Sequence, residues 1–98
     1  MTSYVYILRL NSGGLYIGSC NDLEKRYAEH CKGTASRTTK LDPPVGIVYT
    51  EKFNALIEAR NREAQLKRWS RAKKEALISG DILKLKSLSK SHQKNVLK

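Results

Sequence analysis

The chain has 98 residues, of which 40% are hydrophobic and 29% are charged, and its formal net charge is +10. This composition indicates one small folded domain, because it is too apolar for a disordered chain and has no apolar run long enough to span a membrane. The amino terminus lacks the basic and apolar segments of a signal peptide, so we expect a cytoplasmic protein and a monomer. Cys20 and Cys31 match neither a metal-site spacing nor a disulfide framework, and we expect two reduced thiols.

The positive charge is concentrated in the second half of the chain. Residues 50–98 carry thirteen Lys and Arg against five Asp and Glu, whereas residues 1–49 carry six against four. A field of this sign attracts polyanions, so nucleic acid is the leading partner. An anionic membrane surface is a weaker interpretation, because no helix before residue 81 combines a strong apolar face with a lysine-rich one. Docking on an acidic protein is a third interpretation.

Two segments near the amino terminus, 3–10 and 14–19, are rich in aromatic and β-branched residues, which predicts two strands. The Asn-Ser-Gly sequence at 11–13 has the chemistry of a tight turn, so the strands form a hairpin. A three-residue loop pairs Tyr6 with Gly18 and places Tyr6 and Tyr16 on one face, with an open patch of backbone at Gly18. A four-residue loop would send the two tyrosines to opposite faces.

The rest of the chain predicts helices and one more strand. A capping box of Asn21 and Glu24 predicts a helix over 22–32, which Gly33 ends. The later elements are a polar loop at 34–44, a strand at 45–53, a long helix from its cap Asn54 to about Ser70, a shorter helix at 71–78 before Gly80, a helix at 81–88 and a solvated tail. The order β-β-α-β-α-α predicts an α+β fold with helices flanking a small three-stranded antiparallel sheet. We assign residues 1–80 to this domain and 81–98 to a helical extension with a basic tail.

Arg26 and His30 lie one turn apart on the predicted helix 22–32, at the edge of its apolar stripe of Leu23, Tyr27 and Cys31. Each residue type is ordinary on a helix surface. Together they would form a cationic shelf for a phosphodiester, since Arg26 can bind two oxygens and His30 can exchange a proton near neutral pH.

Tyr6 and Tyr16 also have an ordinary explanation, because tyrosine packs well on sheets. A tyrosine that acts as base or nucleophile must be more acidic than its free pKa of about 10. Arg26 and a metal cation would both lower that pKa.

Glu63 falls on the core-facing stripe of the long helix, together with Leu56, Ala59 and Leu66. A carboxylate drawn toward a core needs a cation or hydrogen bonds to compensate its desolvation. One interpretation is an ion pair with Lys67, four residues later. The other is a divalent metal, since Mg²⁺ is commonly held by one or two carboxylates and substrate phosphate.

The stretch RNREAQLKRWSRAKK at 60–74 carries more positive charge than a solvated face needs, which favours contact with a phosphate backbone. Trp69 within it is either a core anchor or a platform for base stacking. The residues that we expect to bind nucleic acid are Gly18, Lys67, Arg68, Trp69, Arg71, Lys73 and Lys74.

These residues occur in an order that resembles the GIY-YIG nuclease domain, over roughly residues 3–78. Tyr16-Ile17-Gly18 is the second motif unchanged, and Tyr4-Val5-Tyr6 takes the place of the first, with Tyr4 where glycine gives the name. The resemblance extends through NDLEKRYAEH, the third strand and REAQLKRW. It is greatest to the small stand-alone bacterial GIY-YIG proteins of uncharacterised function.

The resemblance implies a divalent-metal-dependent DNA endonuclease, that is, a phosphodiesterase. By position, Tyr6 would activate water as a base or, as in some relatives, attack as the nucleophile. Tyr16 and Arg26 would orient and neutralise the phosphate, and His30 would assist proton transfer. Glu63 would ligate Mg²⁺ or Mn²⁺, which acts as a Lewis acid.

Larger relatives act in homing, excision repair and the resolution of branched DNA, so a role in DNA repair or recombination on branched or damaged DNA is implied. Those with defined targets carry a second domain for which this sequence has no room, and we expect a protein partner to supply targeting. Several relatives place an asparagine downstream that residues 70–85 lack, so another residue substitutes or activity is reduced. The alternative function is a non-catalytic nucleic-acid-binding module with a degenerate site.

Overall fold

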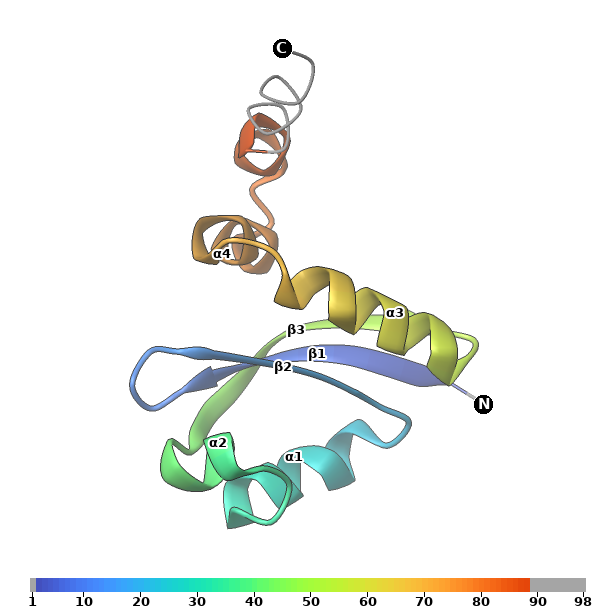
Figure 1. Ribbon diagram of the computed structural model, residues 1–98, viewed down its shortest axis with the longest axis vertical. Helices are drawn as coiled ribbons and strands as arrows, with labels where there is room; N and C mark the ends of the chain where they lie inside the picture. The colour runs from blue at the N-terminus through green and yellow to red at the C-terminus, as the bar shows by residue number, and fades with distance from the viewer. Residues whose placement is uncertain (1, 89–98) are drawn as a thin grey trace. The chain divides into compact units, whose positions relative to one another are not determined.

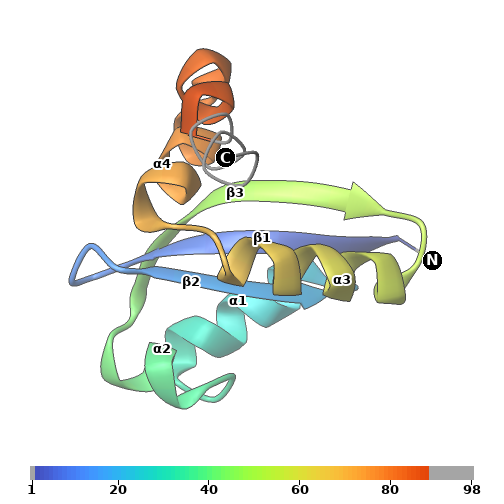
Figure 2. The same cartoon turned by 45° about the horizontal axis from the view of Figure 1, so that its top comes forward.

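The computed structural model describes residues 2–88, which divide into two compact units. The first unit ends at Lys67, and its antiparallel sheet consists of β1 (Ser3–Leu10), β2 (Leu15–Cys20) and β3 (Pro44–Phe53), in the order β2-β1-β3. Figure 1 shows α1 (Leu23–Lys32) and α2 (Arg37–Leu41) on one face of this sheet and α3 (Leu56–Lys67) on the other. The turned view in Figure 2 shows the same layers. The predicted α+β fold with a three-stranded antiparallel sheet is confirmed.

The second unit begins at Arg68 and contains α4 (Arg71–Ser79), followed by a helix over residues 82–88. Ser70 caps α4, because its Oγ accepts the N–H of Lys73 at 3.2 Å, and Gly80 ends it with φ 73°. Along the chain, the boundary between the two units therefore lies between Lys67 and Arg68. The predicted division after residue 80 stays a prediction, and the predicted tail at 89–98 lies outside the described residues.

The hairpin between β1 and β2 has the register that a three-residue turn requires. Leu10 N–H donates to Gly14 O at 2.9 Å, and Gly13 takes φ 92°, a conformation that glycine adopts without steric cost. Tyr6 therefore pairs with Gly18, and Leu8 pairs with Tyr16. This register is confirmed, and it places both tyrosines on the face of the sheet that α1 covers.

Alternate residues of β1 face opposite sides of the sheet and contribute to two core layers. Toward α1, the core consists of Tyr6, Leu8, Leu10 and Cys20, with Tyr4, Tyr16, Leu23 and Tyr27 packed against it. Toward α3, it consists of Val5, Ile7 and Ile17, with Ala59 and Leu66 from the helix. The central strand is buried on both faces and can position side chains in either layer.

Helix α1 begins one residue later than predicted. Its N-cap is Asp22, whose carboxylate accepts the N–H of Lys25 at 3.1 Å, so the predicted capping role of Asn21 is wrong. Gly33 ends the helix as predicted, with φ 79°. The predicted burial is also shifted by one residue, because Cys31 is exposed and His30 is the buried residue of this helix.

Two further boundaries differ from the prediction. The expected polar loop at 34–44 contains α2, whose N-cap Ser36 accepts the N–H of Thr39 at 3.2 Å. Helix α3 begins at Leu56 and ends at Lys67, so Trp69 lies outside the helix that carries Glu63. Ala55, rather than the predicted cap Asn54, directly precedes the helix, and the carboxylate of Glu58 accepts the N–H of Ala55 at 3.1 Å.

An ion pair fastens α3 to the edge strand β3. Arg62 donates from Nε and Nη2 to the two carboxylate oxygens of Glu51, both at 3.0 Å, and Tyr49 donates to the same carboxylate. Burial raises the pKa of Glu51, but the hydrogen bonds from Arg62 and Tyr49 lower this pKa by a larger amount. The net pKa therefore lies below its ordinary value. This bidentate contact holds the helix that carries Glu63 in register with the sheet.

We expect Gly18→Ala to destabilise the fold, because a Cβ at this position would lie 2.6 Å from Cζ of Tyr6. The expected loss is about 1–3 kcal/mol, as for other overpacked cores, and urea denaturation measures it. Gly46→Ala is the matched control, because nothing lies within 4 Å of its Cβ position. Equal losses in the two variants would show that the Tyr6 ring is not held against Gly18.

Candidate active site at the edge of β2

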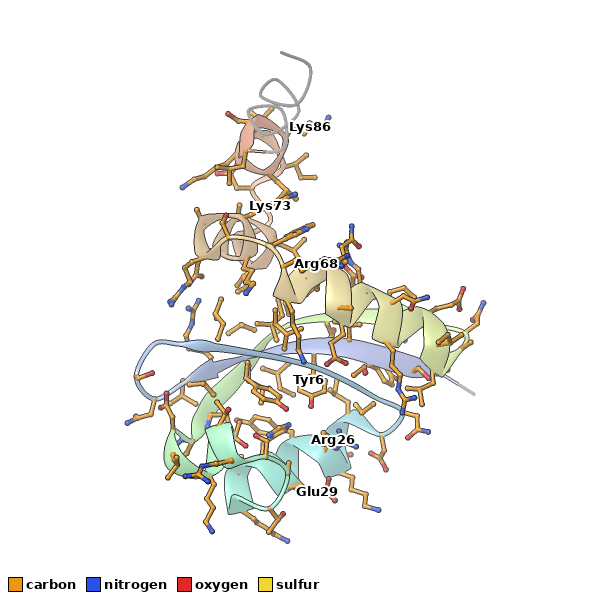
Figure 3. The ribbon with its side chains drawn as sticks, in the orientation of Figure 1. Tyr6, Arg26, Glu29, Arg68, Lys73 and Lys86 are labelled. Atoms are coloured by element: carbon orange, nitrogen blue, oxygen red, sulfur yellow. The ribbon has the colours of Figure 1, made fainter. Side chains whose placement is uncertain are left out.

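The first part of the site is a cluster of three rings between the sheet and α1. The Tyr6 hydroxyl lies 2.8 Å from His30 Nε2, and both residues are 1% exposed. The Tyr16 ring centroid lies 6.4 Å from that of Tyr6 and 4.8 Å from that of His30. In Figure 3, Tyr6 points from the sheet toward the side from which Arg26 comes. The structure therefore brings together Tyr6, Tyr16 and His30, but His30 is buried rather than at the helix edge.

Gly18 provides the space that the Tyr6 ring occupies. The three atoms nearest to a Cβ built on Gly18 all belong to the ring and hydroxyl of Tyr6. The open patch expected at Gly18 is thus filled by the Tyr6 side chain, which corrects the expectation of free space there for a phosphate. A nucleic-acid contact at Gly18 remains a prediction, and it concerns the backbone.

Arg26 lies beside this cluster and is partly exposed. Its Nη1 donates to Ser19 O at 3.5 Å and its Nε donates to Glu29 Oε1 at 3.2 Å. Burial raises the pKa of the Tyr6 hydroxyl to about 12, and the opposing interaction with the Arg26 guanidinium does not offset it. Arg26 thus lowers the pKa of Tyr6 as expected, but burial raises it more, so Tyr6 is less acidic than a free tyrosine.

Glu63 approaches the same strand from the opposite face of the sheet. Gly18 and Cys20 face α1, so Ser19 between them faces α3, where its hydroxyl donates to Glu63 Oε1 at 2.5 Å. Lys67 Nζ lies 2.7 Å from Glu63 Oε2, so the ion pair that the sequence offered as an alternative is present. The Tyr6 hydroxyl and the Glu63 carboxylate thus reach the edge strand β2 at the consecutive residues 18 and 19.

Glu63 is ionised at neutral pH although it is partly buried. Burial raises its pKa, but hydrogen bonds from Lys67 and Ser19 lower it more, so the net pKa is below the ordinary value. His30 is neutral, because burial and then the positive charge of Arg26 lower its pKa, against a smaller effect of Glu29. The resting site therefore combines a protonated phenol, a neutral imidazole and a carboxylate.

A divalent cation would find a single carboxylate here. Among residues 2–88, no three His, Cys, Asp or Glu side chains lie together as a metal site. Mg²⁺ is nevertheless often held by one carboxylate with waters and substrate phosphate, and Glu63 is ionised and only 20% exposed. The residues fit such a cation on condition that Lys67 releases the second carboxylate oxygen.

Three further residues complete the site, and no sequence pattern singled them out: Ser19, Ser36 and Thr39. Thr39 is fully buried and its Oγ1 lies 2.8 Å from His30 Nδ1. Ser36 was recognisable only as a residue type that caps helices, within a segment that looked like a loop. The Thr39–His30 contact joins two helices and the Ser19–Glu63 contact joins a strand to a helix 44 residues away, so no local pattern could show them.

The predicted nucleic-acid-binding residues are divided between the two units. Lys67 belongs to the first unit and is bound to Glu63. In the second unit, Lys73 Nζ lies 4.1 Å from the centre of the Trp69 ring, and Arg71 donates to Glu75 at 3.0 Å. Arg68 is exposed and Lys74 is half-buried. Because Lys73 lies over the Trp69 ring, base stacking on that face would require this lysine to move.

Residues 2–76 match the family model of the GIY-YIG catalytic domain. This chain belongs to the GIY-YIG family. A UPF0213 protein of Staphylococcus saprophyticus is 43% identical to it over 78% of this chain and 93% of that protein. A UPF0213 protein of Natronomonas pharaonis is 40% identical over 80% of this chain and 92% of that protein.

A solved structure supports the same assignment. The solution NMR structure of a UPF0213 protein from Bacillus halodurans is 37% identical, covers 81% of this chain and 84% of its own, and superimposes with a TM-score of 0.53. The resemblance seen in the motifs is therefore confirmed. Within residues 2–88, no helix has the length and apolar character needed to cross a membrane.

The neutral, buried state of His30 predicts a loss of stability on mild acidification. Its folded pKa is lowered from 6.5, so below that pH the unfolded chain binds a proton that the folded protein resists. The free energy of unfolding should fall by up to about 1.4 kcal/mol for each pH unit in this window, measured by urea denaturation.

The variant His30→Asn should flatten this dependence between pH about 7 and about 5, whereas His92→Gln should retain it. The lowered pKa values of Glu51 and Glu63 act only below 4.5, so they do not contribute in this window. The same slope in His30→Asn as in the unmodified protein would contradict the assignment.

Proposed function

We propose that the protein is a divalent-metal-dependent DNA endonuclease. The observation that carries the proposal is the pairing of the Tyr6 hydroxyl with His30 Nε2 at 2.8 Å, beside Arg26 and at the strand edge that Glu63 reaches from α3. Membership of the family whose domain is described as catalytic supports it. The formal charge of +10 supports a polyanionic substrate.

Hydrolysis of a phosphodiester needs a base for water, positive charge for the phosphate and a route for the proton. Tyr6 is protonated at rest, so it acts as a base by passing its own proton to His30 while it takes one from water. Arg26 is partly exposed and can neutralise phosphate oxygens. This electrostatic attraction strengthens as negative charge develops on the phosphate in the transition state. Tyr16 packs against His30 and borders the phosphate.

Glu63 is the residue that would hold Mg²⁺ or Mn²⁺. When bound, such a cation supplies Lewis-acid polarisation of the phosphate. Lys67 competes for this role, because its ammonium lies on Glu63 Oε2. Phosphate arriving at the site gives Lys67 another anionic partner, and this would free the carboxylate oxygen.

Branched or damaged DNA, in repair or recombination, is the substrate class that we propose from the family. A protein partner that supplies targeting belongs to the same proposal. Phosphate contacts by the basic residues of the second unit would position the DNA without reading its sequence.

A second function, binding of nucleic acid without cleavage, is favoured by two observations. The Tyr6 pKa is raised to about 12, and Lys67 occupies Glu63. The phenol therefore keeps its proton and the carboxylate keeps its ion pair, so neither group is ready for catalysis in the protein by itself. This function predicts salt-sensitive binding without turnover, since released counterions make such binding weaken as salt rises.

Cleavage of branched, flapped and linear DNA with Mg²⁺ or Mn²⁺ tests the proposal. Tyr6→Phe should reduce the single-turnover rate by about 10²–10⁴, because the general base is lost. Tyr4→Phe, in the same strand, should cleave normally. Cleavage that survives in Tyr6→Phe would rule out this site, and binding of all three DNAs with no cleavage by the unmodified protein would establish the second function.

Binding of Mn²⁺, measured by electron paramagnetic resonance with a DNA oligonucleotide present, tests the metal assignment. Glu63→Gln should abolish it, whereas Glu58→Gln on the same helix should not. Lys67→Met should strengthen Mn²⁺ binding, because the competing ammonium at 2.7 Å is removed. Unchanged Mn²⁺ affinity in Glu63→Gln would place the metal elsewhere.

A further inference from the structure

The imidazole of His30 is enclosed, and each of its ring nitrogens faces one hydroxyl. Nε2 lies 2.8 Å from the Tyr6 hydroxyl, and Nδ1 lies 2.8 Å from Thr39 Oγ1. A neutral imidazole has one N–H and one lone pair, so one of these contacts is donated and the other is accepted. The partner at one nitrogen thus decides what the other nitrogen can do.

On the Tyr6 side, the geometry favours acceptance by His30. Tyr6 is 1% exposed, and among the described residues its hydroxyl has His30 Nε2 as its hydrogen-bond partner, at 2.8 Å. A proton on Nε2 would leave the buried Tyr6 O–H without an acceptor, so the hydroxyl donates to Nε2. This arrangement requires the proton of the imidazole to be on Nδ1.

On the Thr39 side, the hydroxyl is arranged to accept that proton. Thr39 Oγ1 donates to Ser36 O at 3.4 Å and lies 2.9 Å from Ser36 Oγ, which leaves its lone pairs for Nδ1–H. Thr39 itself is completely buried. The four residues then form one directional array, in which Tyr6 donates to His30, His30 to Thr39 and Thr39 to Ser36.

The short helix that carries Thr39 is fastened at both ends. At its start, Ser36 accepts the N–H of Thr39 at 3.2 Å. At its end, the Asp42 carboxylate accepts the N–H of Ser12 at 3.0 Å and the Ser12 hydroxyl at 2.5 Å, which ties α2 to the β1–β2 turn. The position of Thr39 is therefore set by the same hairpin whose register places Tyr6.

We propose that Thr39 is a positioning residue, which holds His30 in the Nδ1–H tautomer and so makes Nε2 the acceptor of the Tyr6 proton. The inference rests on the proposed function, since it assigns one proton transfer of that reaction. Water gives a proton to the Tyr6 oxygen, and the original hydroxyl proton moves to His30 Nε2. The hydroxide oxygen bonds to phosphorus, the bond from phosphorus to the leaving oxygen breaks, and that oxygen takes a proton from solvent.

The tautomer is measured by NMR on full-length protein labelled with ¹⁵N-histidine, without DNA. The signals of the two histidines are assigned with His92→Gln. We expect Nδ1–H for His30 in the unmodified protein, in Thr39→Ser and in the control Thr38→Val on the same helix. Thr39→Val, which lacks the hydroxyl, should shift His30 toward Nε2–H. An Nε2–H tautomer in the unmodified protein overturns the inference, even if Thr39→Val fails to fold.

Cleavage kinetics give the second readout. Thr39→Val should lower the single-turnover rate on the order of 10- to 100-fold, the size of effect seen when the partner that orients a histidine is lost. Thr39→Ser should restore the rate and Thr38→Val should not change it. An unchanged His30 tautomer in Thr39→Val overturns the inference. A shifted tautomer in a protein that cleaves no DNA supports the positioning role and refutes the nuclease function instead.

Discussion

The packing of the Tyr6 ring on the backbone of Gly18 is the contact on which the site depends. Glycine leaves no Cβ between the ring and the edge strand, so the Tyr6 hydroxyl lies directly against the backbone of β2. There it meets His30 from α1, and Tyr16 packs beside both rings. The pairing of Tyr6 with Gly18 follows from the three-residue turn, because a shift by one residue would turn Tyr16 to the other face of the sheet.

The two faces of the sheet contribute different chemistry to this one strand edge. Toward α1, burial keeps Tyr6 protonated and His30 neutral, so both groups are uncharged at rest. Toward α3, Glu63 carries a charge that Ser19 and Lys67 compensate. In the protein by itself, each of these groups already has a hydrogen-bond or ion-pair partner.

Helix α2 connects the site to the hairpin turn. Thr39, within this helix, contacts His30, and Asp42 at the end of the helix binds Ser12 in the turn between β1 and β2. The side chain of His30 is thus contacted by Tyr6 of β1, Tyr16 of β2 and Thr39 of α2.

Local patterns in the sequence determined the strands, the order of elements and the candidates Tyr6, Tyr16, Arg26, His30 and Glu63, and they narrowed the hairpin register to two choices. Strand alternation, turn chemistry and glycine stops act between near neighbours, so the sequence is sufficient for them. Only the tertiary structure decided that His30 is buried, that Glu63 comes from the opposite face, and that Thr39 and Ser19 hold them. These properties depend on contacts between distant segments, which packing sets and periodicity does not encode.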